Sequence, residues 1–141
     1  TKDVFMKFAL NKQDSFAILS IQEEKLITLN APDLKTELVI LHNEGFHNII
    51  IDLTNTKFID SSGISALLVG NRLCSNADGC FVLTNYSDPV LNLLKISKLD
   101  TVLNLIPTMP EARDFIMMEE LQRELENSED FEAERITDED D

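Results

Sequence analysis

The sequence has no apolar run that approaches about 20 residues, the length that a helix needs to cross a bilayer. It also begins without a basic segment followed by an apolar one, which is the pattern of a secretory signal. These two absences argue against membrane insertion and secretion, so we expect a cytoplasmic protein. The 141 residues, 43% of them apolar, are enough for one domain with a single sizeable core.

Residues that bind metals or carry redox chemistry are scarce. The two cysteines, Cys74 and Cys80, are six residues apart, which fits neither a C-x-x-C redox pair nor a zinc knuckle. The two histidines, His42 and His47, lie in another segment, so a metal site would need ligands from unrelated parts of the chain. The sequence therefore predicts buried thiols, no metal ion and no cofactor.

Basic residues are also few. The chain has 12 Lys and Arg against 26 Asp and Glu, and its net charge is -14. Residues 119–141 alone carry -10 of this charge, because they hold 12 acidic residues and only two arginines. Binding to a phosphate backbone requires clustered Lys and Arg, so this composition argues against nucleic acid as a partner.

The C-terminal segment has too few apolar groups to offset the entropy of ordering it. We therefore expect a folded domain over residues 1–126 and a disordered acidic tail over residues 127–141. The tail is either solubilising or a regulatory arm that competes for a basic surface of a partner.

The hydrophobic pattern predicts an α/β fold. Two strands joined by the polar turn 11–14 form an N-terminal hairpin, and segment 23–29 is either a third short strand or an extended approach to the first helix. That helix begins at a capping Asn30 and ends at Gly45, with Leu34, Leu38 and Leu41 on one face. The predicted strands cover residues 4–9, 16–21, 48–53, 80–84 and 102–106, and the later helices cover residues 63–75, 89–96 and about 110–125. Alternation of strands and helices with short links predicts parallel strands joined by right-handed crossovers, and the hairpin makes the sheet mixed.

Two hydroxyls and a carboxylate stand between the strand at 48–53 and the helix that follows. Segment 58–64 reads FIDSSGI, which puts Ser61 and Ser62 at the N-terminus of the helix. There, backbone N–H groups are unpaired and partial positive charge favours a phosphate. We expect this turn to display Ser61 to solvent and the N–H groups of residues 63–65 to be free to hold a phosphate on it.

The neighbours of the serines each have two interpretations. Asp60 either orients the Ser61 hydroxyl for phosphoryl transfer or caps the backbone N–H groups of the turn. Gly63 either lets a partner approach the hydroxyl closely or relaxes a tight turn.

The helix after the turn has more apolar surface than one core stripe requires. Its core stripe consists of Ala66, Val69, Gly70 and Leu73, with Leu67 and Cys74 at the margin. Ile64 and Leu68 fall on the opposite arc, which also holds Ser65, Asn71, Arg72 and Ser75. Apolar groups rimmed by polar ones beside a modifiable serine predict a docking patch, although a neighbouring loop could also cover the two aliphatic side chains.

Segment 49–64, which reads IIIDLTNTKFIDSSGI, resembles the strand and phosphorylation loop of STAS domains, in particular those of anti-sigma factor antagonists. Segment 87–100 (SDPVLNLLKISKLD) resembles the third helix of this family and the turn after it, and residues 102–112 look like the last strand and the start of the last helix. The resemblance covers about residues 4–118. It implies a STAS-like mixed sheet of about four or five strands, the central ones parallel, with about four helices.

The resemblance implies a partner-switching protein, which is a ligand and a substrate and not an enzyme. In such systems the unphosphorylated antagonist binds an anti-sigma factor that is also a serine kinase. The kinase phosphorylates the serine that matches Ser61, with Ser62 as the alternative, and a cognate phosphatase reverses the modification. We expect a monomer or weak dimer. The residues expected to contact the partner are Asp60, Ser62, Gly63, Ile64, Leu68, Asn71 and Arg72.

The chain departs from the family before the first helix. Many members carry a Gly-x-Leu-Asp turn that contributes to partner contact, whereas residues 26–33 here read LITLNAPD. The acidic residue of that turn has no clear counterpart.

Other functions stay open. A nucleophilic Ser61 would need a nearby base, but the sequence around it is not a Gly-x-Ser-x-Gly elbow, and both histidines precede the strand. A STAS domain can also be an unphosphorylated assembly or adaptor subunit, as in stress-signalling complexes, lipid-transport machinery or anion transporters. Small-ligand binding has no support from a Walker or dinucleotide loop.

Overall fold

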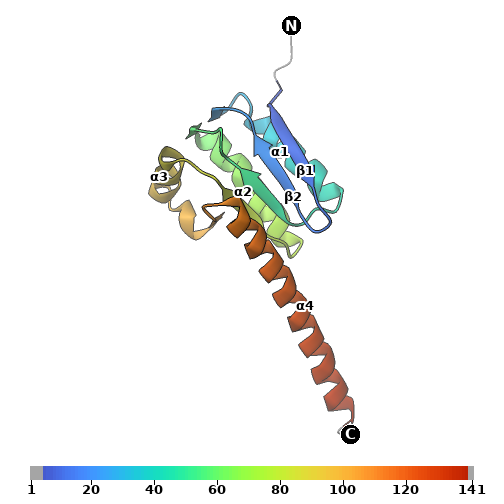
Figure 1. The fold of residues 1–141 in the computed structure, drawn as a ribbon. Helices are drawn as coiled ribbons and strands as arrows, with labels where there is room; N and C mark the ends of the chain where they lie inside the picture. Colours follow the sequence, from blue (N-terminus) through green and yellow to red (C-terminus); the bar gives the residue numbers. More distant parts are fainter. Residues whose placement is uncertain (1–4, 140–141) are drawn as a thin grey trace.

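A mixed five-stranded sheet forms the centre of the computed structural model, which describes the backbone of residues 5–139 and the side chains of residues 5–128 (Figure 1). Its strands are β1 (Phe8–Lys12), β2 (Ala17–Ile21), β4 (Ile49–Asp52), β6 (Phe81–Thr84) and β7 (Asn104–Leu105), in the order β1-β2-β4-β6-β7. β1 pairs antiparallel with β2, and the other neighbours pair in parallel. The predicted mixed sheet with parallel central strands and an N-terminal hairpin is confirmed.

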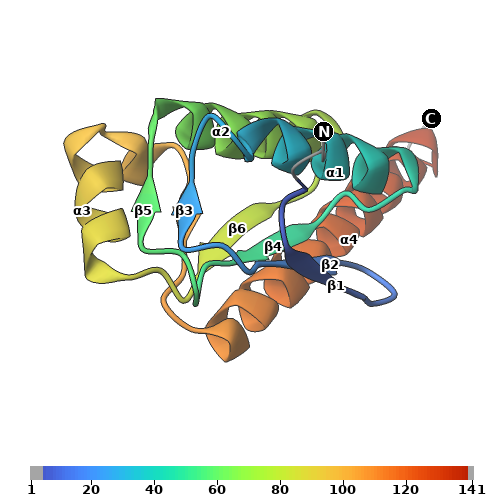
Figure 2. The same ribbon diagram turned by 90° about the horizontal axis from the view of Figure 1, so that it is seen from above.

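Helices cover both faces of this sheet. Figure 2 shows α1 (Ala31–Asn43) and α2 (Ser61–Asn76) on one face and α4 (Met109–Glu139) across the other. α3 (Asp88–Ile96) lies beside β5, and a short 3-10 helix (Leu99–Thr101) follows it. Four α-helices are described, as predicted.

Two apolar clusters fill the spaces between these layers. Ile49 and Ile51 of β4 point into the cluster under α1 and α2, whereas Ile50 points into the smaller cluster under α4. This alternation is the period of two that a strand imposes, and it explains why the first three residues of β4 are all apolar. Cys74 and Cys80 are both free and buried, as predicted, and burial raises the pKa of the Cys74 thiol to about 12.

A separate two-stranded parallel sheet positions the loop before α2. It pairs β3 (Lys25–Leu26) with β5 (Phe58–Ile59). Segment 23–29 therefore contains a short strand, which was one of its two predicted interpretations, while β5 was not predicted. The pairing brings the residues after β3 beside the residues that begin α2.

Several element boundaries differ from the prediction. β1 begins at Phe8 and continues through Lys12, so the turn lies two residues later, and Gln13 N–H donates to Phe16 O at 2.8 Å. Val4, the first residue of the predicted strand, lies outside the described residues. β7 begins at Asn104 because the N–H groups of Val102 and Leu103 bond to Leu99 O in the preceding turn.

Asn30 occupies the N-cap position of α1, but its side chain makes no capping hydrogen bond. Its side chain turns back into the preceding loop, where it accepts from Ile27 N–H and donates to Lys25 O, each at 2.8 Å. The prediction of a side-chain cap is therefore wrong. The burial of Leu34, Leu38 and Leu41 on one face of α1 is confirmed.

Helix α4 extends to Glu139, beyond the end near Leu125 that the sequence predicted. The backbone of residues 127–139 is thus helical where we expected disorder, and residues 140–141 lie outside the described residues. No Gly or Pro follows Pro110, and Glu, a good helix former, is the commonest residue of the segment, so nothing local ends the helix. A division between a domain and an acidic tail at residue 126 stays a prediction. Within residues 5–139, no helix combines the length and apolarity that a membrane span requires.

Candidate functional site

Asp60 forms the N-cap of α2. Its backbone is extended (φ -97°, ψ -174°), and its Oδ1 accepts a hydrogen bond from Gly63 N–H at 2.9 Å. Its Oδ2 accepts from the N–H of Thr28 at 3.0 Å and from the Thr28 hydroxyl at 3.2 Å. The bond from Gly63 N–H is the largest cause that lowers the pKa of Asp60, and the Thr28 donors add to it. The capping role of Asp60 is confirmed, and the side chain is a carboxylate at neutral pH.

The two serines after Asp60 lie in different surroundings. Ser61 is the first residue of α2 and is exposed, whereas Ser62 is half-buried. The Ser62 Oγ is 2.9 Å from the Oγ1 of Thr28, so this hydroxyl is held by the chain itself. The spacing of the two serines in the sequence could not show which of them is accessible. The structure shows that it is Ser61.

The expected phosphate-binding donors are already in use. Gly63 N–H bonds to the Asp60 carboxylate, and Ile64 N–H bonds to the Asp60 carbonyl at 3.0 Å. The prediction that the N–H groups of residues 63–65 are free is therefore wrong for the first two. The N-cap carboxylate occupies Gly63 N–H, and Ile64 N–H makes an ordinary helical bond to a backbone carbonyl. A phosphate on Ser61 would lie beside a carboxylate that already accepts from Gly63 N–H.

Gly63 is explained by packing within the chain. It is buried, and a Cβ built on it would lie 2.4 Å from the carbonyl oxygen of Leu26 and 2.6 Å from Cγ2 of Ile59. Any larger residue would push α2 away from the small sheet of β3 and β5. The space beside Gly63 is filled by the chain's own atoms, so this residue does not open a path for a partner.

Ile64 and Leu68 are half-buried on the outer side of α2, where they pack against the main apolar cluster. Leu68 also lines a hollow of about 320 Å³, together with Asn71, Arg72, Ser75, Asn76 and Val102. Three of the predicted contact residues thus share one hollow, which lies about 10 to 22 Å along the helix axis from Ser61. Val102, which is 52% exposed, was not predicted there because the sequence placed it in a strand.

Thr28 is the residue of this site that sequence reasoning missed. It lies in the segment that departs from the family turn, and it bonds to both Asp60 and Ser62. No motif marks it, because only the pairing of β3 with β5 brings it to the loop. The next residue, Leu29, is 64% exposed and adds an apolar side chain in this segment.

A second carboxylate, Asp52, lies at the end of β4 with donors of its own. It accepts hydrogen bonds from the Thr54 hydroxyl at 2.6 Å, from Asn85 Nδ2 at 3.1 Å and from the Ser20 hydroxyl at 3.2 Å. Burial alone would raise the pKa of Asp52, but these bonds outweigh it and lower the pKa. Asp52 and Asp60 therefore belong to separate hydrogen-bond clusters.

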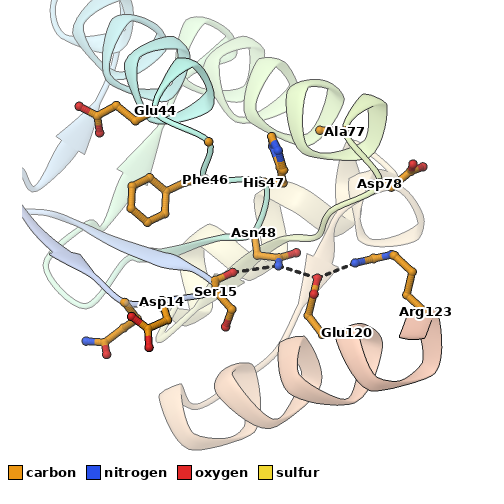
Figure 3. A pocket seen from close by; sticks show the side chains of 12 residues that line it. Asp14, Ser15, Glu44, Phe46, His47, Asn48, Ala77, Asp78, Glu120 and Arg123 are labelled. Atoms are coloured by element: carbon orange, nitrogen blue, oxygen red, sulfur yellow. Dashed lines mark hydrogen bonds and ion pairs between the residues drawn. The ribbon is translucent and has the colours of Figure 1, made fainter. Parts of the chain in front are cut away.

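A hollow of about 610 Å³ lies near the C-terminal end of α2, away from Ser61 (Figure 3). Asn48 forms part of its wall and is only 4% exposed. Its Nδ2 donates to Ser15 O at 3.0 Å and to Glu120 Oε1 at 2.8 Å, and Glu120 also pairs with Arg123. These contacts join α4 to the amino-terminal end of β4. The polar side chains in this wall of the hollow are therefore explained by the packing of α4 on the sheet.

Metal binding finds no support in the described part of the chain, where no three His, Cys, Asp or Glu side chains are placed to hold an ion.

The family model of the STAS domain matches residues 7–112, and the chain belongs to this family. The resemblance seen in the sequence is confirmed. Among solved structures, TM1081 of Thermotoga maritima superposes with a TM-score of 0.70 at 22% identity, covering 78% of this chain and 94% of that one. The anti-sigma factor antagonist SpoIIAA in its unphosphorylated form gives a TM-score of 0.62 at 18% identity, with coverage of 79% and 98%. Phosphorylated SpoIIAA of Bacillus gives 0.63 at 20% identity, with coverage of 78% and 99%.

The same fold occurs inside a much larger protein. The murine anion transporter Slc26a9 matches 77% of this chain with 18% of its own length, at 18% identity and a TM-score of 0.64. At these identities the structures establish a shared fold.

Proposed function

We propose that this chain is an anti-sigma factor antagonist that acts in the cytoplasm as a partner switch. It binds an anti-sigma factor kinase while Ser61 is unmodified and is released when the kinase phosphorylates Ser61. One observation carries this proposal. Ser61 is exposed at the N-terminus of α2, next to Asp60, whose carboxylate is charged and already accepts hydrogen bonds. The chain is then a substrate and a ligand, and the kinase and a cognate phosphatase supply the catalysis.

The surroundings of Ser61 suit a switch that acts by charge. A phosphate adds about -1.5 to -2 charges at neutral pH. Because Asp60 occupies Gly63 N–H, the helix terminus has less capacity left to neutralise the new charge. At an effective dielectric of about 20, like charges ~4 Å apart repel by about 4 kcal/mol. If a docked partner feels half of that repulsion, about 2 kcal/mol, its binding weakens by roughly thirtyfold.

The outer side of α2 is the proposed docking surface. Ile64 and Leu68 give it partly exposed apolar groups, and Asn71 and Arg72 give it a polar rim. Such a combination is typical of interfaces that form and dissociate. Phosphorylated SpoIIAA and its unphosphorylated form share the fold of this chain, which supports a mechanism without refolding.

The first test is phosphorylation. The protein is incubated with ATP and with candidate anti-sigma serine kinases from the same genome, and the products are mapped by mass spectrometry. We expect one phosphate on wild type and on Ser62→Ala, and none on Ser61→Ala. A phosphate on Ser62 in the wild type would transfer the proposed role to that residue.

The second test is binding. Ser61→Ala and Ser61→Asp are titrated against the kinase that modifies the protein, with isothermal calorimetry as the readout. We expect Ser61→Asp to bind at least about tenfold more weakly, because one added charge reproduces part of the phosphate. Equal affinity of the two variants would show that charge at this position is not the signal.

An alternative function is an assembly or adaptor subunit that is never phosphorylated, in a stress-signalling complex or in lipid-transport machinery. The occurrence of the fold as a module of the Slc26a9 transporter favours this alternative. It predicts no phosphate on Ser61 with any candidate kinase, together with a partner that binds Ser61→Ala and Ser61→Asp equally.

A further inference from the structure

Helix α4 carries a second apolar surface. Met117, Met118, Leu121 and Leu125 are 61%, 63%, 49% and 55% exposed. At about 100° per residue, these four side chains fall within one arc of about 100° around the helix. We call them the α4 stripe.

The stripe faces away from the sheet because other contacts fix the rotation of the helix. Ala112 and Ile116 are fully buried in the cluster under α4, and they lie on the arc opposite the stripe. One turn further on, Glu120 accepts the hydrogen bond from Asn48, as Figure 3 shows. Turning the stripe inward would break both contacts, so in this fold the stripe stays on the surface.

The stripe is also distinct from the surface around Ser61. Glu120 and Arg123, which flank Leu121 in sequence, line the hollow near the C-terminal end of α2, whereas Ser61 begins that helix. α2 has 16 residues, so its ends are about 24 Å apart. In Figure 1, α4 continues from here away from the body of the domain.

The charge around the stripe determines which occupant fits. Asp114 and Glu124 are exposed beside it, together with Arg113, and residues 119–141 carry a net charge of -10. A second copy of the chain would bring two such segments together, and like charges along paired helices oppose association. A groove with an apolar floor and a rim of Lys and Arg would complement both the stripe and its flanks.

We propose that the α4 stripe and its acidic flanks dock into an apolar groove rimmed by Lys and Arg on a partner protein. This docking surface is independent of the proposed switch at Ser61. It gives the domain a second attachment point, which phosphorylation of Ser61 leaves unchanged.

The test uses the full chain and two fluorescein-labelled helical peptides as probes. Both peptides carry a Leu seam, flanked in one by Lys and in the other by Glu, and binding is followed by fluorescence anisotropy. We expect the Lys peptide to bind and the Glu peptide to bind at least about tenfold more weakly. The double variant Leu121→Ser/Leu125→Ser should weaken binding of the Lys peptide by at least about tenfold.

Two controls isolate the stripe. Val39→Ser/Ile40→Ser changes side chains that are 41% and 42% exposed on α1, and it should leave the affinity for the Lys peptide unchanged. Ser61→Asp should also leave it unchanged, which separates this proposal from the switch. Equal binding by wild type and by the α4 double variant would overturn the proposal. So would sedimentation velocity that shows a dimer dissociated by Leu121→Ser, because a second copy would then cover the stripe.

Discussion

At the scale of single residues, Asp60 joins two segments that are far apart in sequence. Its carboxylate accepts hydrogen bonds from Thr28 in the segment after β3 and from Gly63 in the first turn of α2. These donors favour the charged form, which is why the pKa of Asp60 lies below its usual value of 3.8. Asp60 therefore both caps the helix and holds the segment that carries Thr28 against it.

The sign of this pKa shift predicts a pH dependence. A carboxyl group whose pKa is lowered in the folded state stabilises the fold above its unfolded pKa, and the stabilisation disappears as the pH falls through the folded pKa. Asp60→Asn keeps the shape and one acceptor but removes the charge. We expect its melting temperature to be lower than that of wild type at pH 7, and the difference to narrow below a pH of about 4.

Circular dichroism melts from pH 3 to pH 8 measure this difference. Asp100→Asn, which changes an exposed carboxylate of the short 3-10 helix, is the matched control and should follow wild type at each pH. A difference between Asp60→Asn and wild type that is constant over the whole range would contradict a role for the carboxylate charge.

Residues close to the motif were predictable, and their distant contacts were not. The cap at Asp60 and the exposed Ser61 follow from a short polar turn before an apolar helix, which is a local pattern. Thr28 is 34 residues from Ser62, and its contact exists only because two strands of two residues each pair in parallel. Strands that short have no detectable period, so neither β5 nor the contact could be derived from the sequence.

At the scale of elements, α2 contributes one face to the core and offers the other as the proposed partner surface. Its periodicity predicted an inner and an outer face, and the structure confirms the burial of Ala66 and Gly70 and the partial exposure of Leu68. Val69 and Leu73, also predicted for the inner face, are only half-buried. Gly70 belongs to the inner face because a Cβ there would lie 2.4 Å from the ring of Phe81. The outer face keeps Ile64 and Leu68, which pack against the main cluster and are still partly exposed.

This difference between faces can be measured with two neighbouring leucines. Leu67 is fully buried, so Leu67→Asp places an unpaired charge in the core and should cost more than about 3 kcal/mol of the free energy of unfolding. Leu68 is half-buried and lines an open hollow, so Leu68→Asp should cost only about 1 kcal/mol. Under the proposed function, Leu68→Asp should still abolish binding of the kinase.

Urea denaturation followed by circular dichroism gives the two free energies, and calorimetry gives the binding. Ser65→Asp, which adds a charge at an exposed position of α2, is the control for charge alone. Equal destabilisation by Leu67→Asp and Leu68→Asp would place Leu68 in the core and remove it from the docking surface.

At the scale of the whole molecule, charge and core occupy different parts of the chain. Within residues 109–128, the buried side chains of α4 are Ala112 and Ile116, with Met109 and Phe115 packed beside them. Residues 127–141 hold eight acidic residues and one arginine, which is half of the net charge of -14. Composition alone suggested disorder for this segment, whereas helix propensity and the lack of a stop signal favour the helix in the structure.

Removal of residues 127–141 separates the contribution of the acidic segment to stability from that of the buried core. Because Ala112 and Ile116, which α4 buries against the sheet, lie before this segment, we expect the free energy of unfolding to change by no more than about 0.5 kcal/mol. The far-ultraviolet circular dichroism signal should fall, since part of α4 is removed, and urea titration at low and high salt gives the free energy. The shortened chain should depend less on salt, because it carries half of the self-repelling charge. A loss of more than about 2 kcal/mol would mean that the distal part of α4 supports the fold, and the division at residue 126 would be wrong.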